Sequence, residues 1–188
     1  GHTAVWTGSN MLVWGGMGID GKFGDGAAYD PVSDEWRKTK MEGGPEARSG
    51  HTAVWTGSEM LIWGGRTGEV TAGSGYAYDS NKDSWRKLPI LEGPEPRQAH
   101  TANWTGVEMV VFGGTTTTGE VNTGYALDPN KNKWRSLTTV GSPLKRSGHT
   151  AIVTGDDLVI FGGLSEGVPL SAPQRLNLQG TWYLYRKL

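Results

Sequence analysis

Residues 1–16 read GHTAVWTGSNMLVWGG, and residues 50–65 repeat them as GHTAVWTGSEMLIWGG. Two more divergent copies of the same stretch follow later in the chain. Self-similarity at a fixed step of this length is typical of stacked or radially arranged units, so we expect four repeats in place of one irregular core. Between the first two copies only two of the sixteen positions differ: Asn10 against Glu59, and Val13 against Ile62.

The step between copies is 49 residues, and four kinds of position keep it through the chain. They are a histidine, a pair of glycines, a late aromatic residue and a turn residue. The members are His2, His51, His100 and His149; Gly15-Gly16, Gly64-Gly65, Gly113-Gly114 and Gly162-Gly163; Trp36, Trp85, Trp134 and Tyr183; and Asp30, Asp79, Asp128 and Asn177.

Composition narrows the classes of function. The chain has 188 residues, with 18 Lys and Arg against 19 Asp and Glu and a net charge of −1. This balance provides no basic surface, so we expect no nucleic-acid partner. Cysteine is absent, which excludes disulfides and thiol catalysis in this chain. No apolar run reaches the about 18 residues of a transmembrane helix, so we expect no membrane insertion.

The start of the chain lies inside a repeat. Gly1 stands two residues after the place where the later repeats carry an arginine, and it is not a methionine. We therefore expect this sequence to be a piece of a longer protein. The composition leaves the compartment open, because secreted bacterial proteins also lack cysteine in many cases. A secreted or cell-surface location is our expectation.

The second repeat shows the expected local structure. Four short runs are rich in β-branched and aromatic residues, the first two are joined by a Thr-Gly-Ser turn, and Asp79 suits an Asx turn between the last two. No helical period is present. Four strands in each repeat are the pattern of β-propeller blades, so we predict an all-β fold. The runs are HTAVW (51–55), EMLIWGG (59–65), GYAYD (75–79) and SWRKL (84–88).

We predict one complete or partial propeller domain over residues 1–188. Large rings at fixed strand positions, such as Trp6 and Trp14, are expected to fill the space between neighbouring blades. The paired glycines that end each second strand permit positive φ and close backbone approach. The predicted blades are residues 1–49, 50–98, 99–147 and 148–188.

The stretch RSGHTAVWTGSEMLIWGG, followed by YAYDSNKDSWRKL, resembles the kelch repeat in the form common in bacterial kelch-type β-propellers. The diagnostic parts are an Arg-x-x-His start, a double glycine after an apolar strand, and a Tyr and a Trp separated by an Asp turn. These parts run through the whole chain in register. The resemblance implies four-stranded blades arranged radially around a central channel.

The chain departs from the kelch pattern in two ways. Kelch rings usually have more than four blades. The fourth repeat is also degraded, with Val153 in place of the first-strand Trp, Leu176 in place of the Tyr, and YLYRKL at the end, which suits a terminal blade. Two arrangements stay open: a closed four-bladed ring, or an arc whose exposed blade faces associate with another copy, with a partner chain or with missing blades.

The connections between second and third strands, the b–c loops, are the candidate binding surface. They are about ten residues long and differ between repeats while the strands barely differ. Variable loops on a fixed scaffold are the usual place for binding groups, and neutral drift of solvated loops is the alternative. The b–c loops are residues 17–26, 66–75, 115–124 and 164–173. The candidate ligand-binding residues there are Asp20, Lys22, Asp25, Arg66, Glu69, Thr117, Glu120, Asn122 and Glu166.

Three arginines, Arg48, Arg97 and Arg146, stand before the first strands of the later repeats, on the same predicted face as the b–c loops. A group of guanidiniums at a channel mouth could bind a carboxylate through bidentate hydrogen bonds, and we include all three in the predicted ligand-binding set. In the structural alternative, each arginine ties the connection from the fourth strand to the next first strand, the d–a connection, to the neighbouring blade.

We predict no metal site, no cofactor and no catalytic residue. The four repeated histidines lie on different blades, whereas a metal needs its nitrogen ligands at about 2 Å. A histidine that bonds the neighbouring strand is therefore the expected role. No glycine-framed nucleophile elbow is present either.

We therefore expect a non-catalytic binding or scaffolding module that presents its b–c and d–a loops to a protein, peptide or glycan. Two alternatives stay open. One is a sugar-active enzyme, because some kelch propellers resemble copper-radical sugar oxidases or sialic-acid mutarotases. The oxidase chemistry needs a cysteine cross-linked to tyrosine, so only a mutarotase-like activity remains. The other alternative is an architectural repeat of a large surface protein.

Overall fold

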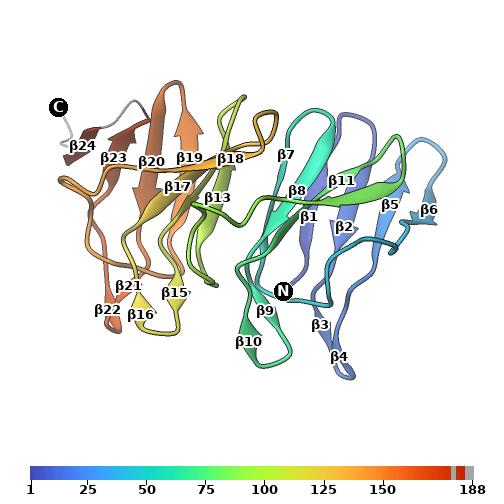
Figure 1. Cartoon of the computed structure of the whole chain (residues 1–188), viewed down its shortest axis with the longest axis horizontal. Helices are drawn as coiled ribbons and strands as arrows, with labels where there is room; N and C mark the ends of the chain where they lie inside the picture. The colour runs from blue at the N-terminus through green and yellow to red at the C-terminus, as the bar shows by residue number, and fades with distance from the viewer. Residues whose placement is uncertain (179–180, 185–188) are drawn as a thin grey trace. The chain divides into compact units, whose positions relative to one another are not determined.

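The computed structural model describes residues 1–178 and 181–184, and in these residues all the regular structure is β-strand (Figure 1). Each repeat forms one antiparallel four-stranded sheet, here called blades 1 to 4, in the order in which the strands occur along the chain. The predicted all-β class and the four-stranded blades are confirmed.

The chain forms two compact units, Gly1–Ile90 and Leu91–Leu188, each with two blades. Whether the units form one domain stays a prediction. In the first unit, blade 1 contains β1 (Thr3–Trp6), β2 (Met11–Trp14), β5 (Gly26–Asp30) and β6 (Glu35–Lys38), and blade 2 contains β7 (Thr52–Trp55), β8 (Glu59–Trp63), β11 (Gly75–Asp79) and β12 (Ser84–Lys87).

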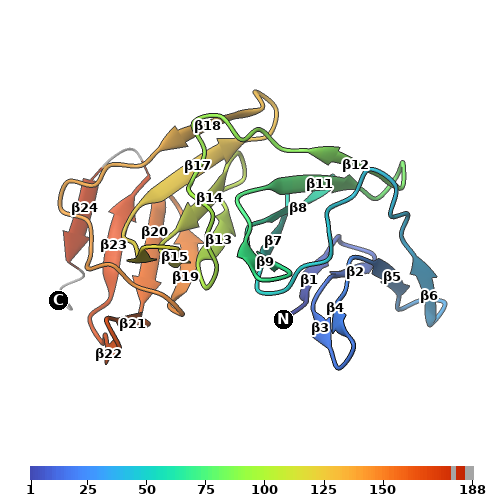
Figure 2. The same ribbon diagram turned by 60° about the horizontal axis from the view of Figure 1, so that its bottom comes forward.

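The second unit has the same plan, and Figure 2 shows the strand order of its first sheet. Blade 3 contains β13 (Thr101–Trp104), β14 (Met109–Phe112), β17 (Gly124–Asp128) and β18 (Lys133–Ser136), and blade 4 contains β19 (Thr150–Thr154), β20 (Asp157–Phe161), β23 (Gln174–Asn177) and β24 (Thr181–Leu184). The side chain of Tyr183 and part of the YLYRKL stretch lie outside the described residues. No helix in the described part of the chain could span a membrane.

Short polar motifs fix the turns between strands. The Thr56 hydroxyl accepts the N–H of Glu59 at 2.9 Å and closes the turn between β7 and β8. Asp79 Oδ1 accepts the N–H groups of Asn81 and Lys82 at 3.0 and 3.1 Å. This is the predicted Asx turn, in which the side chain replaces a backbone acceptor.

The paired glycines bring the end of the second strand against the start of the first strand. Gly65 has φ +85°, and a Cβ added there would lie 2.6 Å from Ser49 O and from His51 N. Only glycine fits a backbone contact this close. The approach lets Ser49 form an antiparallel bridge with Arg66, so that the d–a connection is held against the b–c loop.

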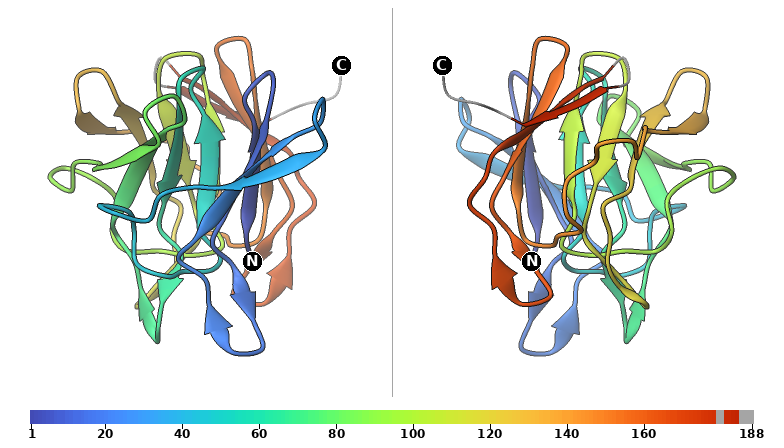
Figure 3. Two further views of the ribbon diagram at one scale, coloured as in Figure 1. Left: turned by 90° about the vertical axis from the view of Figure 1, so that its right-hand side faces the viewer. Right: turned by 90° about the vertical axis from the view of Figure 1, so that its left-hand side faces the viewer.

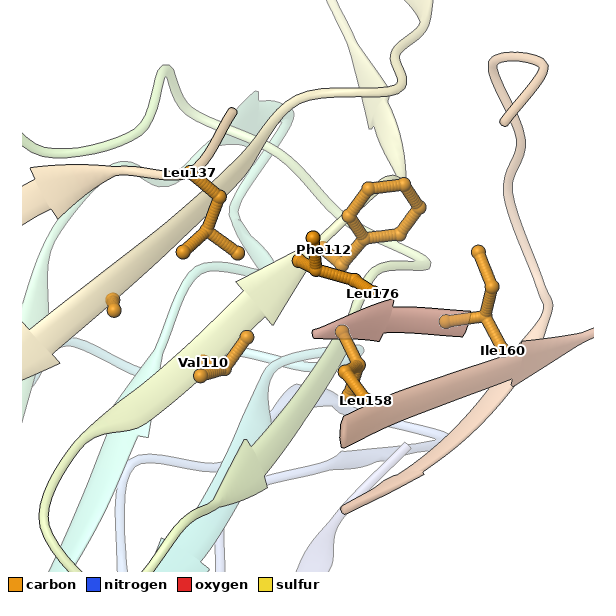
Figure 4. Packing of buried hydrophobic residues seen from close by; sticks show 7 residues of the cluster. Val110, Phe112, Leu137, Leu158, Ile160 and Leu176 are labelled. Carbon is orange, nitrogen blue, oxygen red and sulfur yellow. The ribbon is translucent and has the colours of Figure 1, made fainter. Parts of the chain in front are cut away.

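The core of each unit lies between its two blades. In the first unit, Leu12, Trp14 and Ala28 of blade 1 pack on Met60 and the other core residues of blade 2, Ile62, Tyr76 and Tyr78. Figure 4 shows the equivalent cluster of the second unit, which contains Val110, Phe112, Ala126, Leu137, Leu158, Ile160 and Leu176. The predicted use of large rings between blades is therefore confirmed for Trp14, whereas it is wrong for Trp6, which is 54 % exposed.

Each b–c loop contains a two-stranded hairpin, which the sequence pattern did not predict. In the first unit, β3 (Met17–Gly18) pairs with β4 (Gly21–Lys22), and β9 (Arg66–Thr67) pairs with β10 (Val70–Thr71). In the second unit, β15 (Thr115–Thr116) pairs with β16 (Gly119–Glu120), and β21 (Leu164–Ser165) pairs with β22 (Val168–Pro169). Strands of two residues are too short to show alternation of apolar and polar side chains.

Candidate functional site

The b–c hairpins form one end of each unit. Within the first unit, β3–β4 and β9–β10 extend from the same end of the two sheets, and β15–β16 and β21–β22 do so within the second unit (Figures 1 and 3). We call this end the loop face of a unit. It consists of residues 17–26 and 66–75 in the first unit, and of 115–124 and 164–173 in the second.

The loop face of the first unit brings Lys22, Arg66 and Glu69 into defined contacts. Lys22 Nζ donates to the carbonyl oxygen of Gly68 at 2.6 Å, which links the hairpin of blade 1 to that of blade 2. Arg66 Nη2 lies 3.2 Å from Glu69 Oε2 within one hairpin. Asp20 and Asp25 are exposed beside them. The hairpins therefore present charged groups whose positions are fixed by neighbouring backbone.

Exposed apolar side chains on this loop face were not among the sequence candidates. Ile19 is fully exposed at the hairpin tip, and Met17, Phe23 and Val70 are also exposed. Because these side chains are exposed, they contribute little to the hydrophobic stabilisation of the fold. The sequence signal was available, because apolar residues in a Gly-rich polar loop are out of place in a solvated turn.

The second unit ties its loop face to a d–a connection. Glu120 Oε2 accepts the N–H of Glu166 at 3.2 Å, and Glu166 Oε1 lies 2.6 Å from Lys145 Nζ. This pair raises the pKa of Lys145 and lowers the pKa of Glu166. Asn122 Nδ2 donates to Ser142 Oγ at 2.8 Å. Asn122 therefore holds the loop in place, Thr117 is exposed, and Lys145 joins the charged groups of this face.

The three predicted arginines lie inside the protein. Arg48 Nη1 donates to the carbonyl oxygens of Gly64 and Ser74 at 3.1 and 3.0 Å, and its Nη2 donates to Ser74 Oγ at 3.0 Å. Arg97 repeats this pattern with Gly113 and Thr123, and it is 0 % exposed.

Arg146 donates to the carbonyl oxygens of Gly162 and Leu144 at 3.0 and 3.2 Å and is also buried. Burial lowers the pKa of all three guanidiniums. These donors are used by main-chain carbonyl groups, which is the contact pattern of the structural alternative, and a role of the three arginines in ligand binding stays a prediction. Arg48 and Arg97 each tie a d–a connection to the b–c loop of the following blade, and Arg146 ties one to Gly162 of the glycine pair before that loop.

The buried histidines link neighbouring blades. His51 Nε2 lies 2.7 Å from Thr3 Oγ1, and His149 Nε2 lies 3.0 Å from Thr101 Oγ1. The His51 ring also meets the Trp14 ring edge to face at 5.1 Å. Burial lowers the pKa of both histidines to about 4. Among the described residues, no group of three or more His, Cys, Asp or Glu side chains could hold a metal ion.

A polar cavity of about 290 Å³ lies at the opposite end of the first unit and was not predicted. Asn10 and Arg37 line it, together with Ser9, Asp30 and Asn81. In blade 2, Glu59 holds the matching Arg86 through two hydrogen bonds, whereas blade 1 has Asn10 in place of that glutamate. Arg37 instead lies 3.4 Å from Asp83 of the next blade.

Residues 1–185 match the family model for the KLHDC2/KLHL20/DRC7 kelch-repeats domain. Curated proteins gave no match to this chain. The family match does not support the bacterial origin that the form of the repeat suggested. Kelch domains generally bind proteins, and members of this family are mostly non-catalytic. The diagnostic motifs, the four-stranded blades and a match over nearly the whole sequence agree, and the chain belongs to the kelch-repeat family.

Proposed function

We propose that this chain is a non-catalytic binding module whose loop faces bind a protein, peptide or glycan, with a protein or peptide as the preferred ligand. One observation carries the proposal. The blades repeat nearly the same strands, whereas the hairpins differ and expose apolar and charged groups side by side, such as Ile19, Val70 and Glu69. Apolar anchors surrounded by charged groups are the usual composition of protein-binding surfaces.

The loop faces are also ordered before a ligand binds. The Lys22–Gly68 hydrogen bond joins neighbouring hairpins in the first unit, and the Lys145–Glu166 pair joins a hairpin to a d–a connection in the second. A binding surface that is already ordered loses less conformational entropy on association. These contacts therefore support a rigid recognition surface.

The test is selection of peptides from a random display library, and a glycan array in parallel. We expect selected ligands to lose at least tenfold in affinity for the double variant Ile19→Asp, Val70→Asp. Val32→Asp serves as the matched control, because Val32 is equally exposed but lies in the turn between β5 and β6. Ligands that bind both variants as tightly as the parent chain would place recognition elsewhere, and failure to select any ligand would favour the architectural alternative.

Among the residues that the structure describes, no contact favours the mutarotase-like enzyme over the binding module. The acid–base pairs on the loop faces, Arg66–Glu69 and Lys145–Glu166, lie on exposed hairpins where water competes for them. An assay of sialic-acid mutarotation with the purified chain tests this alternative directly. A secreted or cell-surface location also stays a prediction, and fractionation of the source cells with an antibody to this chain would test it.

A further inference from the structure

Blades 2 and 3 each hold an arginine against a glutamate at the end of the sheet opposite the loop face. In blade 2, Arg86 donates two hydrogen bonds to the carboxylate of Glu59, at 2.8 Å from Nε and 2.5 Å from Nη2. Blade 3 repeats this contact between Arg135 and Glu108, at 2.9 and 2.6 Å. In this bidentate geometry the guanidinium and the carboxylate neutralise each other.

A second ion pair lies in the following turn of the same two blades. Lys82 Nζ lies 2.8 Å from Asp79 Oδ2 in blade 2. Lys131 Nζ lies 2.8 Å from Asp128 Oδ2 in blade 3. Asp79 is the cross-strand partner of Glu59, so the two pairs of blade 2 are neighbours in the sheet. Blades 2 and 3 therefore neutralise these four charges with their own residues.

Blade 1 has one member of each pair and lacks the other. Arg37 and Asp30 occupy the positions of the arginine and the aspartate, whereas Asn10 and Ser33 stand where blades 2 and 3 carry the glutamate and the lysine. Among the described residues, the Asp30 carboxylate accepts only backbone N–H groups of its own turn. Blade 1 therefore presents a cation and an anion without the partners that the next two blades supply.

Asp83 of blade 2 does not replace the missing glutamate. Its Oδ1 accepts the N–H of Lys40 at 2.9 Å and the hydroxyl of Tyr78 at 2.5 Å, and its Oδ2 lies 3.4 Å from Arg37 Nη1. The Arg37 side chain is still 54 % exposed. Within the described residues, no carboxylate contacts Nε and Nη2 of Arg37 as the glutamate of blade 2 contacts those of its arginine.

The polar cavity of about 290 Å³ lies where the two partners are missing. All four of the blade 1 positions just compared line it, so the two charges face one space inside the first unit. The buried side chains of Leu12 and Ala28 form an apolar part of the wall, and Ser80 and Asn81 in the turn of blade 2 form another part. Glu35, the cross-strand partner of Asp30, adds a second carboxylate.

We propose that this cavity binds a small zwitterion, in which a carboxylate and an ammonium group are joined by a short aliphatic chain. The carboxylate takes the place of the missing glutamate on Arg37, and the ammonium takes the place of the missing lysine beside Asp30. The aliphatic part contacts Leu12 and Ala28. A ligand with a carboxylate alone would leave Asp30 and Glu35 unmatched, which is why both charges are required.

The size and the place of the cavity agree with this proposal. Its volume is near the lower end of the range of about 300–1,000 Å³ for small-molecule sites, which suits a ligand of a few heavy atoms. The cavity lies at the opposite end of the unit from the loop face. The proposal is therefore independent of the binding of a protein, peptide or glycan at the hairpins.

The test is titration of the ¹⁵N-labelled chain with the series of ω-amino acids from glycine to 6-aminohexanoate, followed by amide chemical shifts. The series varies the distance between the two charges. We expect at least one member to cause saturable shifts centred on residues 7–12, 28–37 and 80–81. Acetate and methylammonium, which carry one charge each, should bind at least about tenfold more weakly. Absence of saturable shifts with every member, or equally tight binding of acetate, would overturn the proposal.

Two variants introduce into blade 1 the residues of blades 2 and 3. Asn10→Glu supplies Arg37 with a carboxylate, and Ser33→Lys supplies Asp30 with a cation, so each is expected to weaken binding of the zwitterion at least about tenfold. Thr117→Glu is the matched control, because it adds a charge at an exposed position of the other unit and should leave the affinity unchanged. Binding by both blade 1 variants as tight as in the parent chain would exclude this cavity as the site.

A third variant separates the role of the guanidinium from an effect on folding. Arg37→Gln removes the cation without adding a new charge. The zwitterion should then bind no more tightly than methylammonium, while thermal unfolding shows that the variant is folded. A folded Arg37→Gln variant that still prefers the zwitterion to methylammonium by the parent ratio would contradict the assignment of the carboxylate to Arg37.

Discussion

At the scale of single residues, buried arginine and histidine side chains stabilise the interior of each unit. The arginines donate hydrogen bonds to main-chain carbonyl groups, and the histidines link neighbouring blades. Arg48 hydrogen-bonds four acceptors from two loops, and His51 joins two sheets through Thr3. Both side chains are buried, so their removal or protonation acts on folding. Two predictions belong to this scale.

Replacement of Arg48 by alanine should destabilise the protein by roughly 3 kcal/mol, because it leaves buried carbonyl oxygens of Gly64 and Ser74 without donors. Arg66→Ala is the matched control, since Arg66 forms an exposed pair with Glu69 that is worth less than about 1 kcal/mol. Denaturant unfolding of the two variants gives the comparison. Equal losses would mean that the guanidinium of Arg48 is not a structural tie.

Stability should fall as the pH drops from 6.5 toward 4. His51 and His149 have their ordinary pKa of 6.5 lowered to about 4 by burial first and then by the charge of a neighbouring arginine. The folded protein therefore binds fewer protons than the unfolded chain between these values, and it loses stability as protons are added. At most about 3 kcal/mol is lost for each histidine.

Unfolding in denaturant at pH 7 and pH 5 measures this effect. Carboxylates whose pKa is lowered in the folded protein reduce its stability only when the pH falls to their ordinary pKa near 4, so they do not contribute in this interval. His51→Gln should flatten the pH dependence, whereas Val32→Ala, which changes an exposed apolar side chain, should leave it as in the parent chain. An unchanged slope in His51→Gln would contradict the assignment.

At the scale of elements, glycine pairs and hairpins determine how each sheet meets its connections. The positions of the glycine pairs and of the Asx turns could be predicted, because they depend on neighbours in sequence. For Arg48 the sequence left two alternatives open, because its acceptors lie 16 and 26 residues away and spacing alone does not show which loop returns to it. The hairpin that carries Ile19 could not be predicted, because its strands have only two residues each, although an apolar residue in a Gly-rich polar loop was itself a signal.

Gly65→Ala should be much more destabilising than Gly57→Ala. Both glycines have positive φ, +85° and +101°, so both substitutions carry backbone strain of about 1 kcal/mol or more. A Cβ on Gly65 would also lie 2.6 Å from two backbone atoms, whereas a Cβ on Gly57 would meet nothing within 4 Å. The difference between the losses of unfolding free energy in the two variants measures the cost of the close contact at Gly65. Similar losses would show that strain alone explains the glycine pairs.

At the scale of the whole molecule, stability depends on contacts between neighbouring blades. The 49-residue repeat predicted correctly that the chain is built of repeated units that pack on one another. The kelch family and the four-stranded blades could be predicted from motifs in register. The burial of each sheet face could not, because Met60 and Tyr78 of blade 2 are buried in a cluster with blade 1, whereas Trp6 and Trp36 of blade 1 are exposed. A residue pattern shows that a sheet face is suited to packing against another sheet. The three-dimensional structure is needed to show whether another sheet covers that face.

Leu158→Ala should destabilise blades 3 and 4 and leave the backbone protection of blade 1 nearly unchanged. Leu158 is fully buried in the cluster of the second unit, and a leucine-to-alanine change in such a core costs about 2–5 kcal/mol. In repeat proteins the effect is confined mainly to the neighbouring repeat. Native-state hydrogen exchange measures the protection of the backbone amides in each blade separately. An equal fall in protection at every amide would indicate one cooperative unit.

Blades 1 and 2 carry the same row of cross-strand neighbours, which affects how such a chain can lengthen. The row is Trp6, Met11, Tyr29 and Trp36 in blade 1 and Trp55, Met60, Tyr78 and Trp85 in blade 2. A 49-residue segment duplicated between these blades would meet on each side the same side chains that are already in contact there. Gain of a blade would therefore create no new kind of interface and would need no compensating substitution. A single duplication between blades 1 and 2 could therefore add a blade. A duplication between the diverged blades 3 and 4 would require further substitutions as well.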